Sequence, residues 1–243
     1  MSNEDLAFDT VTEIPHSSFP IRLSAMHVLL TAGPTYEPLD PVRFLGNRST
    51  GKMGYALAEA FAAAGAQVTL VSGPSQLPDP ASPRIRTVRV ETAAEMFAAA
   101  EQVAAAADVW VFAAAVADYR PAQVAVEKIK KSGETLTLEL VKNVDIAATL
   151  GQRKRAEQFA VGFALETTNE LAHAQGKLHR KNFDLVVLNS LRDAGAGFGH
   201  DTNKVSVLDA AGQIVNFELQ SKADVARGLV SLILARRPSS PTL

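Results

Sequence analysis

The residues whose types and spacing most clearly indicate a chemical role form the segment Gly46–Gly54. This segment departs from a nucleotide-binding P-loop at one position. A P-loop has the pattern G-x-x-x-x-G-K followed by Ser or Thr, whose hydroxyl coordinates the Mg²⁺ of the nucleotide. Gly46, Gly51 and Lys52 have this spacing, but Met53 carries no hydroxyl. Small residues, a cation and a predicted helix start still make an anion site. The segment is therefore predicted to hold a phosphate, but not in the P-loop manner.

The same segment has a simpler interpretation, as a turn into a helix with Ser49 or Thr50 as the N-cap. The phosphate interpretation is favoured because Asn47, Arg48 and Lys52 crowd one phosphate-sized space. Charged donors gathered in this way form the short, strong hydrogen bonds by which proteins bind phosphate.

Further candidate groups follow other predicted strands. Asp118 comes shortly after Ala113–Ala115, and a carboxylate at the carboxyl end of a strand can hold a ribose hydroxyl or Mg²⁺. Taken alone, the three alanines are better explained as small-residue packing. The ring of Phe163 can belong to the core or stack on a base.

Lysines form two further groups. Lys128, Lys130 and Lys131 are either a solvated cluster or a mobile flap that places ammonium groups on developing phosphate charge. Lys177 and Lys181 are four residues apart and so share one helix face, where like charges repel by roughly a few tenths of a kcal/mol. An anion bound between them would remove this repulsion, and a solvated polar face is the alternative.

The elements that must position these groups follow an α/β pattern. From Met26 onward, short β-branched runs alternate with alanine-rich helical stretches, which is typical of a parallel sheet. Thr92 and Glu95 predict a capping box at the start of a helix. Leucines at alternate positions in 134–141 predict an extended or hairpin segment. The predicted strands are 27–31, 67–71, 86–90, 109–114, 158–164 and 184–189, with a C-terminal antiparallel hairpin at 204–208 and 214–219. The predicted helices are 52–64, 93–106, 145–155, 169–181 and 222–235, and 33–50 is predicted to be a long loop.

The unusual segments follow the carboxyl ends of predicted strands. They are the loop 33–51, the segment 113–118, the segment 162–166 and Asn189. Because ligands of open parallel sheets bind at the carboxyl ends of the strands, these segments are predicted to form one site on one edge of the sheet.

Length and composition limit the class of protein. The 243 residues suit one large domain, with 26–236 as the folded unit, 1–25 as a flexible N-terminal tail and 237–243 as a frayed C-terminus. A formal net charge of −2 gives no reason to expect nucleic-acid binding, and no apolar run approaches the length of a membrane span. The absence of cysteine excludes a disulfide, a thiolate metal site and a cysteine nucleophile, which fits a cytoplasmic enzyme.

Together these segments resemble phosphopantothenate–cysteine ligase, a family of coenzyme A biosynthesis. The resemblance keeps its order over roughly residues 26–235. Its matching segments are 31–33, 37–43, 47–54, 113–121, 128–131, 142–146, 162–167, Lys177, Lys181, Asn189 and 198–203. Many motifs in one order are far more specific than any single motif.

The resemblance implies a homodimeric ligase with a Rossmann-like, doubly wound and mostly parallel sheet that has helices on both faces. Its co-substrate would be CTP or ATP with Mg²⁺. The carboxylate of 4′-phosphopantothenate would attack the α-phosphate and release pyrophosphate. The amine of L-cysteine would then displace the nucleoside monophosphate from the acyl-nucleotidylate.

The resemblance also implies roles for particular residues. Asn47 would contact the acyl-nucleotidylate with Arg43 and Ala115 nearby, and Lys128 would stabilise charge from a flap that closes over the site. Asp118 would bind ribose or the metal ion. The nucleotide would be surrounded by Ala114, Ala115, Asp118, Lys128, Val144, Asp145, Ile146, Ala147, Phe163, Lys177 and Lys181.

Some positions depart from the family pattern. Pro34 and Tyr36 replace a Gly and an Arg common in the first loop, Val144 replaces a Pro, and Leu165 replaces an Ala. In many bacteria the ligase domain is fused behind a flavin-dependent decarboxylase, which 243 residues leave no room for. The decarboxylase is therefore expected to be a separate chain.

Three rival functions are less well supported. An NAD(P)-dependent oxidoreductase needs G-x-G-x-x-G after the first strand, where this chain has none. A P-loop NTPase is disfavoured by Met53 and by the 14 residues between Thr31 and Gly46. A non-catalytic binding module would leave the lysines and Asp118 unexplained.

Overall fold

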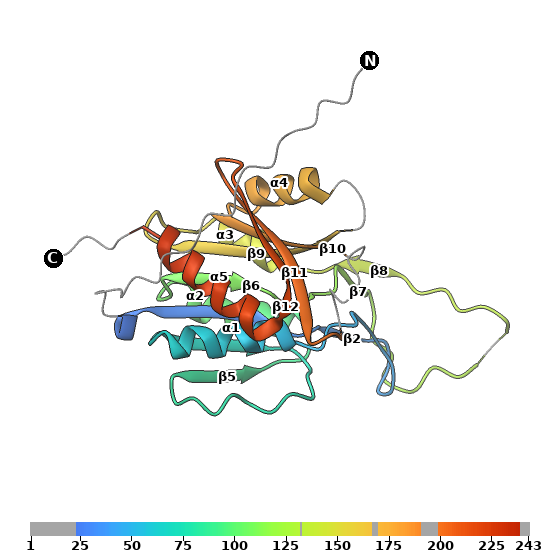
Figure 1. Ribbon diagram of the computed structural model, residues 1–243. Coiled ribbons are helices and arrows are strands. Elements are labelled where there is room, and N and C mark those ends of the chain that lie inside the picture. The colour runs from blue at the N-terminus through green and yellow to red at the C-terminus, as the bar shows by residue number, and fades with distance from the viewer. Residues whose placement is uncertain (1–22, 132, 167–169, 191–198, 239–243) are drawn as a thin grey trace, which may run out of the picture.

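The protein is built around one eight-stranded sheet, seen in a computed structural model that describes residues 23–131, 133–166, 170–190 and 199–238 (Figure 1). The strand order is β5-β4-β1-β6-β9-β10-β11-β12, and the strands from β5 to β10 are parallel. β11 and β12 are antiparallel, as the predicted terminal hairpin requires. The strands are β1 (His27–Ala32), β4 (Gln67–Ser72), β5 (Ile85–Arg89), β6 (Val109–Phe112), β9 (Phe159–Glu166), β10 (Leu185–Ser190), β11 (Thr202–Asp209) and β12 (Ile214–Ser221).

Helices cover both faces of this sheet (Figure 1). One apolar core joins α1 (Lys52–Ala63) and α5 (Lys222–Arg236) to the sheet, and a second core joins α2 (Ala93–Ala104), α3 (Ile146–Gly151) and α4 (Glu170–Arg180) to the opposite face. β1 supplies both cores, because alternate residues of a strand point to opposite faces of a sheet. The Rossmann-like, doubly wound fold is therefore confirmed.

The helix starts follow the sequence in all but one case. Thr92 and Glu95 form the predicted capping box at α2, and Ser221 caps α5. The alternative N-cap at α1, Ser49 or Thr50, is wrong. Gly51 occupies that position with φ of 83°, a left-handed conformation that glycine adopts without steric cost, and no side chain caps the helix.

Two predicted segments differ in detail. The loop 33–50 contains a short hairpin, β2 (Tyr36–Pro38) and β3 (Phe44–Gly46), whose rings at Tyr36 and Phe44 stack 3.8 Å apart. These three-residue strands were not predicted because the prolines of this loop disfavour strand structure. The segment 134–141 is strand only at its end, where β8 (Leu140–Lys142) pairs with β7 (Tyr119–Pro121).

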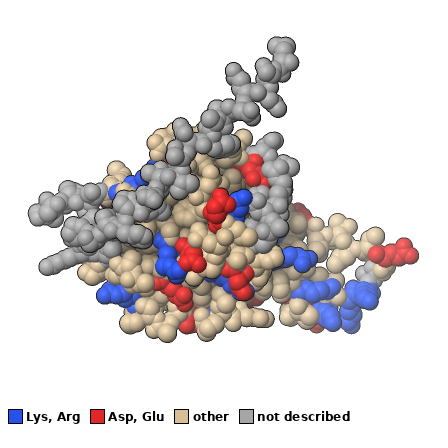
Figure 2. All heavy atoms as spheres, in the orientation of Figure 1, with Lys and Arg blue, Asp and Glu red and all other residues tan. Residues whose placement is uncertain are grey.

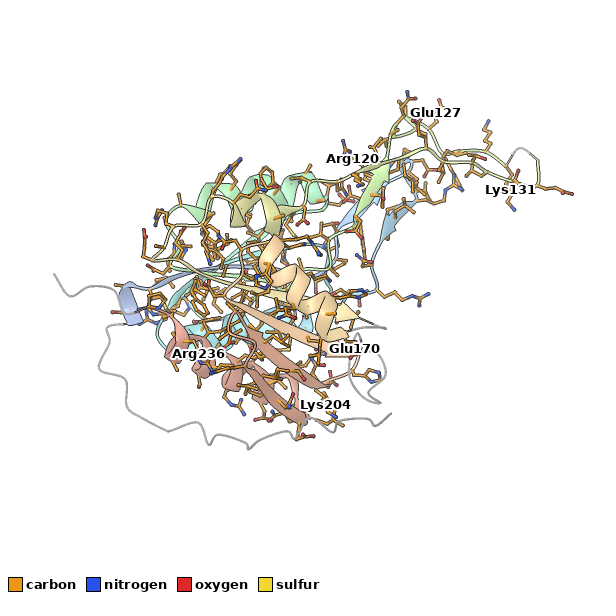
Figure 3. All side chains as sticks on the ribbon, turned by 90° about the horizontal axis from the view of Figure 1, so that it is seen from above. Arg120, Glu127, Lys131, Glu170, Lys204 and Arg236 are labelled. Carbon is orange, nitrogen blue, oxygen red and sulfur yellow. The ribbon has the colours of Figure 1, made fainter. Side chains whose placement is uncertain are left out.

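Residues 122–131 and 133–139, here called the arm, project from the body of the protein (Figure 1). Leu136 is 56% exposed, so its alternation with polar residues does not bury one face of a strand. Basic side chains gather on the arm (Figure 2), where Lys128, Lys130 and Lys131 are exposed. Figure 3 shows Lys131 far from the sheet and Arg120 near the start of the arm.

α3 ends four residues before the predicted limit, at Gly151. Asn182 donates a hydrogen bond to the Gly151 carbonyl, and a Cβ at Gly151 would lie 2.0 Å from the carbonyl oxygen of Lys181. The residues that follow α4 thus pack against the last residue of α3 and bond to its carbonyl. The predicted N-terminal tail lies almost entirely outside the described residues, as does most of the predicted C-terminal tail. No helix in the described part of the chain is long and apolar enough to cross a membrane.

Candidate functional site

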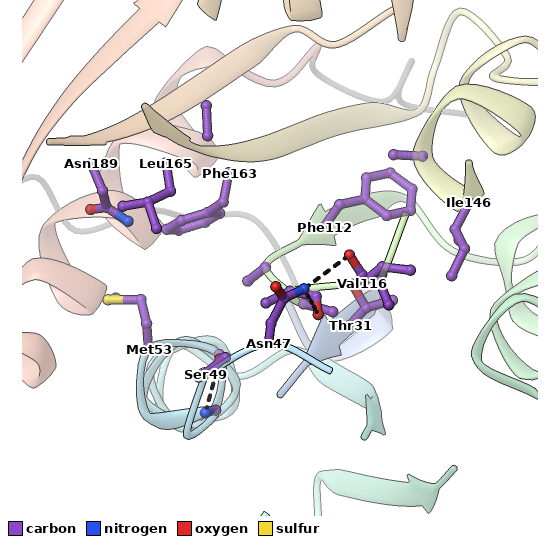
Figure 4. Close-up of a pocket in the computed structure, with 18 of the residues that line it drawn as sticks. Thr31, Asn47, Ser49, Met53, Phe112, Val116, Ile146, Phe163, Leu165 and Asn189 are labelled. Carbon is purple, nitrogen blue, oxygen red and sulfur yellow. Dashed lines mark hydrogen bonds between the residues drawn. The ribbon is translucent and has the colours of Figure 1, made fainter. Parts of the chain in front are cut away.

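A pocket of about 410 Å³ opens at the carboxyl ends of the parallel strands (Figure 4). It is lined from the loops after β1 and β6, from the end of β9 and from Asn189 on β10, so the predicted meeting of four segments at one sheet edge is confirmed. Most of the predicted site residues line it. They are Asn47, Ala114, Ala115, Asp118, Val144, Asp145, Ile146, Ala147, Phe163, Lys177 and Lys181.

Asn47 connects two of these segments. Its Nδ2 donates to the carbonyl of Ala115 at 2.9 Å and to that of Val116 at 3.2 Å (Figure 4). The Ala115 N–H in turn donates to the carbonyl of Gly33 at 2.8 Å. Because both donors of the Asn47 amide are used, Oδ1 remains as the acceptor that this side chain can offer a ligand.

Asp118 is exposed at the edge of the pocket, and its backbone is held by Asn143. The Asn143 N–H donates to the Asp118 carbonyl at 2.8 Å, and Asn143 Nδ2 donates to the carbonyl of Ala117 at 2.8 Å. No group of three or more His, Cys, Asp or Glu side chains suited to a metal occurs among the described residues. A single carboxylate fits Mg²⁺ that receives most of its other ligands from bound phosphates and water.

Lys177 lines the pocket from α4, and Lys181 lines it from the residue that follows the last residue of this helix. Lys181 Nζ lies 2.9 Å from the carboxylate of Asp145, which also accepts from the Ala148 N–H and so caps α3. Asp145 therefore orients Lys181, in addition to lining the pocket itself. The predicted repulsion on this helix face is partly offset by that one carboxylate.

Apolar side chains also line the pocket. Val144, Ile146 and Ala147 line it from the start of α3, and the ring of Phe163 lines it from β9 (Figure 4). Gly162 precedes this ring, and a Cβ at Gly162 would lie 2.0 Å from the ring of Phe183. These apolar groups form a surface on which a flat ring can stack.

A second cationic group lies where α1 and α5 begin. Lys52 Nζ lies 2.6 Å from Asp201 Oδ1, and this ammonium lowers the pKa of the Asp201 carboxyl. Lys222 is 8% exposed and donates to the carbonyl of His200. Burial lowers the pKa of Lys222, and the neighbouring Lys52 lowers it further. Both lysines line the pocket, whereas Arg48 does not.

Arg43 and Lys128 do not line the pocket within the described residues. Arg43 binds Asp40, whose side chain is fully buried, through Nε at 3.0 Å and Nη2 at 2.5 Å. Asp40 also accepts from the N–H of Ile129, and Arg43 donates to the Ile129 carbonyl. The Arg43 guanidinium is the main cause that holds the pKa of Asp40 well below its usual range. The first loop is thereby fastened to the arm beside Lys128.

Residues 23–236 match the domain family described as "DNA/pantothenate metabolism flavoprotein C-terminal domain". This range covers most of the 243 residues. The chain belongs to this family.

Curated relatives of this chain include longer proteins. "Cysteine/Cysteine sulfinic acid decarboxylase", from an unknown prokaryotic organism, is 48% identical over 212 residues, which are 87% of this chain and 59% of the relative. "Coenzyme A biosynthesis bifunctional protein CoaBC" of Bacillus subtilis is 46% identical over 213 residues, which are 88% of this chain and 52% of the relative. The chain thus spans about half the length of the curated relatives it matches.

Solved structures agree with this assignment. The C-terminal domain of a CoaBC protein is 41% identical with a TM-score of 0.73, and the match covers 87% of this chain and 96% of that domain. A Cab2 H337A mutant in complex with phosphopantothenate-cysteine has a TM-score of 0.70, covering 88% of this chain and 86% of that one. At 20% identity, this structural match shows that the two chains share a fold.

Lys222 and Asn203 line the pocket but were not predicted as site residues from the sequence. Lys222 carried one local signal, because a cation is unfavourable at the first residue of a helix. Asn203 donates to Asn189 Oδ1 at 3.0 Å and contacts the sulfur of Met53 at 3.8 Å. Met53 therefore packs at the start of α1 and lines the pocket, which is consistent with a role that needs no hydroxyl.

Proposed function

We propose that this chain joins 4′-phosphopantothenate to L-cysteine in coenzyme A biosynthesis, using CTP or ATP. One observation carries the proposal: a single pocket brings together Asn47, Asp118, two pairs of lysines and an apolar surface. Support also comes from relatives at 46% and 43% identity that are named for coenzyme A biosynthesis, from Bacillus subtilis and Escherichia coli. The fold is shared with a protein solved with phosphopantothenate-cysteine.

The first half-reaction forms an acyl-nucleotidylate. A carboxylate oxygen of phosphopantothenate bonds to the α-phosphorus as the bond from that phosphorus to the bridging oxygen breaks, and pyrophosphate leaves with the electron pair. Such phosphoryl transfer depends mainly on positioning and on offsetting negative charge. Lys177 on α4 and Lys181 just after this helix supply positive charge, with Lys181 oriented by Asp145.

In the second half-reaction the cysteine nitrogen bonds to the acyl carbon, the bond to the nucleotide oxygen breaks, and a proton leaves the nitrogen. Asn47 positions the reacting group, because its amide is fixed on the carbonyls of Ala115 and Val116 and offers Oδ1 as an acceptor. Bound Mg²⁺ would offset the charge of the phosphates. Asp118 is the carboxylate that would hold it.

The base of the nucleotide is assigned to the apolar lining of the pocket, which includes the ring of Phe163 and the side chains of Val144 and Ala147. Stacking of this kind accepts cytosine or adenine, because every base has a π-face. The choice between CTP and ATP is therefore left to experiment.

Formation of pyrophosphate tests the proposal directly. We expect pyrophosphate when the chain is given 4′-phosphopantothenate, Mg²⁺ and either CTP or ATP, with the amide formed only after cysteine is added. Pyrophosphate can be followed by a coupled assay and the amide by mass spectrometry. Absence of pyrophosphate with both nucleotides would contradict the ligase function, and tight binding of NADPH would favour an oxidoreductase.

We also propose that the chain is a homodimer. Large apolar side chains are exposed on the β2–β3 hairpin, on β7 and β8, and on the arm: Val42, Phe44, Tyr119, Val124, Val126, Leu136 and Leu140. A second copy that covers this surface would bury it and add its own Arg43 and Lys128 to the partner's surroundings.

Light scattering on the protein as it elutes from a size-exclusion column is expected to give twice the mass of the 25.8 kDa chain. Val126→Asp, at a side chain that is 92% exposed, is expected to shift the mass toward that of one chain while the protein stays folded at room temperature. A monomer mass for the unmodified protein over the micromolar range would contradict the dimer.

A further inference from the structure

The backbone of the pocket segment 115–118 is held at its far end by Asn143. Asn143 Nδ2 donates to the carbonyl of Ala117 at 2.8 Å, and the Asn143 N–H donates to the carbonyl of Asp118 at 2.8 Å. The Ala117 N–H donates to Oγ1 of the fully buried Thr35 at 2.9 Å, so Ala117 is bonded on both sides. Because the Asp118 side chain is exposed, its place at the edge of the pocket depends on these backbone contacts.

Asn143 also stands directly before the part of the pocket that is assigned to the base. Residues 144–147 follow it in the chain and all line the pocket. Val116 and Ile146 in Figure 4 belong to the two segments that Asn143 joins. Its side chain holds the segment that contains Val116, and its main chain leads into α3. One residue therefore sets the spacing between these two segments.

The two ends of the Asn143 amide have different partners. Arg120 on β7 donates through Nη1 to the carbonyl of Lys142 at 2.8 Å and to Asn143 Oδ1 at 3.3 Å. The amide oxygen is thus turned toward Arg120 and the amide nitrogen toward Ala117. Asparagine has a donor and an acceptor on one short side chain, whereas aspartate has no donor. Arg120 is exposed near the start of the arm (Figure 3), and it does not line the pocket in the described part of the chain.

We propose that Asn143 is a positioning residue for the nucleotide, which fixes the spacing between Asp118 and the start of α3, and that Arg120 orients its amide. This inference rests on the proposed function, because it takes a nucleoside triphosphate with Mg²⁺ as the ligand of the pocket. The base would lie on the apolar lining that begins at Val144, and the ribose or the metal ion would lie at Asp118. Misplacing one of these groups relative to the other weakens binding although both remain in the protein.

A merely structural role makes a different prediction. The β7–β8 pair ends at Tyr119 and Lys142, so Asn143 would in that case serve only to fasten the base of the arm. Loss of its amide would then lower Tm and leave the nucleotide affinity of the folded protein unchanged. Direct binding of a nucleotide separates the two roles, and it does not depend on turnover.

The test is calorimetric titration of the full chain with CTP and, separately, with ATP, each with Mg²⁺ and without 4′-phosphopantothenate. Asn143→Ala removes both amide bonds and is expected to weaken binding of the preferred nucleotide at least about fivefold, the scale of one lost hydrogen bond. Asn143→Asp keeps the shape and the bond to Arg120, but it turns a carboxylate oxygen toward the Ala117 carbonyl. It is expected to weaken binding at least as much. Arg120→Met leaves the amide without its guide and is expected to weaken binding about threefold.

Two matched variants control for the loss of an amide and for the loss of a cation outside the pocket. Asn216→Ala removes an amide that bonds to Ser206, and Arg153→Met removes the cation of an exposed pair with Glu101. Both are expected to bind the nucleotide within about twofold of the parent. In turnover, the loss in Asn143→Ala should appear in the KM for the nucleotide, with kcat changed less than about threefold, because the lost contact supports ground state and transition state alike.

The outcomes separate the positioning role from the proposed function. Nucleotide affinity within twofold of the parent in folded Asn143→Ala would overturn the proposal and leave the ligase function standing. If Asn143→Ala does not fold, Arg120→Met decides the question, because Arg120 is exposed and belongs to neither apolar core. A parent chain that binds neither nucleotide would reject both ideas. Weaker binding by Asn143→Ala in a chain without ligase activity would uphold the positioning role and reject the proposed function.

Discussion

Asn47→Asp is expected to slow pyrophosphate release at saturating substrates by at least about 100-fold, the scale of loss that follows a misplacement of about 1 Å in a reacting group. Asn47 Nδ2 donates to two backbone carbonyls, those of Ala115 and Val116. An aspartate of the same shape has no donor, so its carboxylate would be repelled by both carbonyls. The side chain would turn away and leave the segment 115–116 without this support.

The loss should be visible in activity rather than in folding. Asn47 is exposed, so Tm measured by differential scanning calorimetry is expected to change by no more than a few degrees. Asn216→Asp makes the same chemical change on β12, at an exposed residue outside the pocket, and is expected to retain the parent rate. Turnover by Asn47→Asp within threefold of the parent would remove Asn47 from its assigned role.

Much of the fold could be predicted because its signals are local. The strand Val109–Phe112 is apolar throughout, as the centre of a parallel sheet requires, and Thr92 and Glu95 mark the start of α2 within four residues. The β2–β3 hairpin could not be predicted in this way, because its three-residue strands are stabilised by the stacking of Tyr36 on Phe44. The alternating leucines of the arm predicted a longer extended segment, but the arm has no core for them to face.

The site was predictable where residues follow the carboxyl ends of strands. Asn47, Asp118 and Phe163 lie beside such ends, and the parallel sheet brings them to one edge. Lys222 begins a helix that follows an antiparallel hairpin, so no rule of strand ends includes it. Only the packing of α5 against α1 brings it to Lys52. Local sequence patterns cannot predict a contact between residues so far apart in the chain.

Asp40→Ala is expected to release the arm and to make trypsin cleave after Lys128, Lys130 or Lys131 at least about tenfold faster, because charged hydrogen bonds to the arm are lost. Cleavage can be followed by mass spectrometry over a time course. The buried carboxylate accepts from the N–H groups of Val42, Arg43 and Ile129 as well as from the Arg43 guanidinium. Without it, Arg43 is left without its anionic partner, and Tm is expected to fall by several degrees.

Asp79→Ala is the matched control for this prediction. Asp79 also lies 2.6 Å from an arginine, Arg89, but both side chains are largely exposed, and such surface pairs contribute little to stability. Its Tm and its cleavage rate in the arm are expected to equal those of the parent. Equal cleavage rates in Asp40→Ala and the parent would show that Asp40 does not hold the arm.

The pKa of Asp40 sets the pH range of this contact. A carboxyl whose pKa is lowered on folding contributes its full stability above its unfolded pKa near 3.9, and loses that contribution progressively as the pH falls from there to the folded value. The difference between Asp40→Ala and the parent is therefore expected to be constant from about pH 5 to 8. Since Asp40 holds both Arg43 and the backbone beside Lys128, its loss should alter turnover through two residues that lie outside the pocket. Nucleotide affinity, which depends on residues that line the pocket, should then change less than kcat.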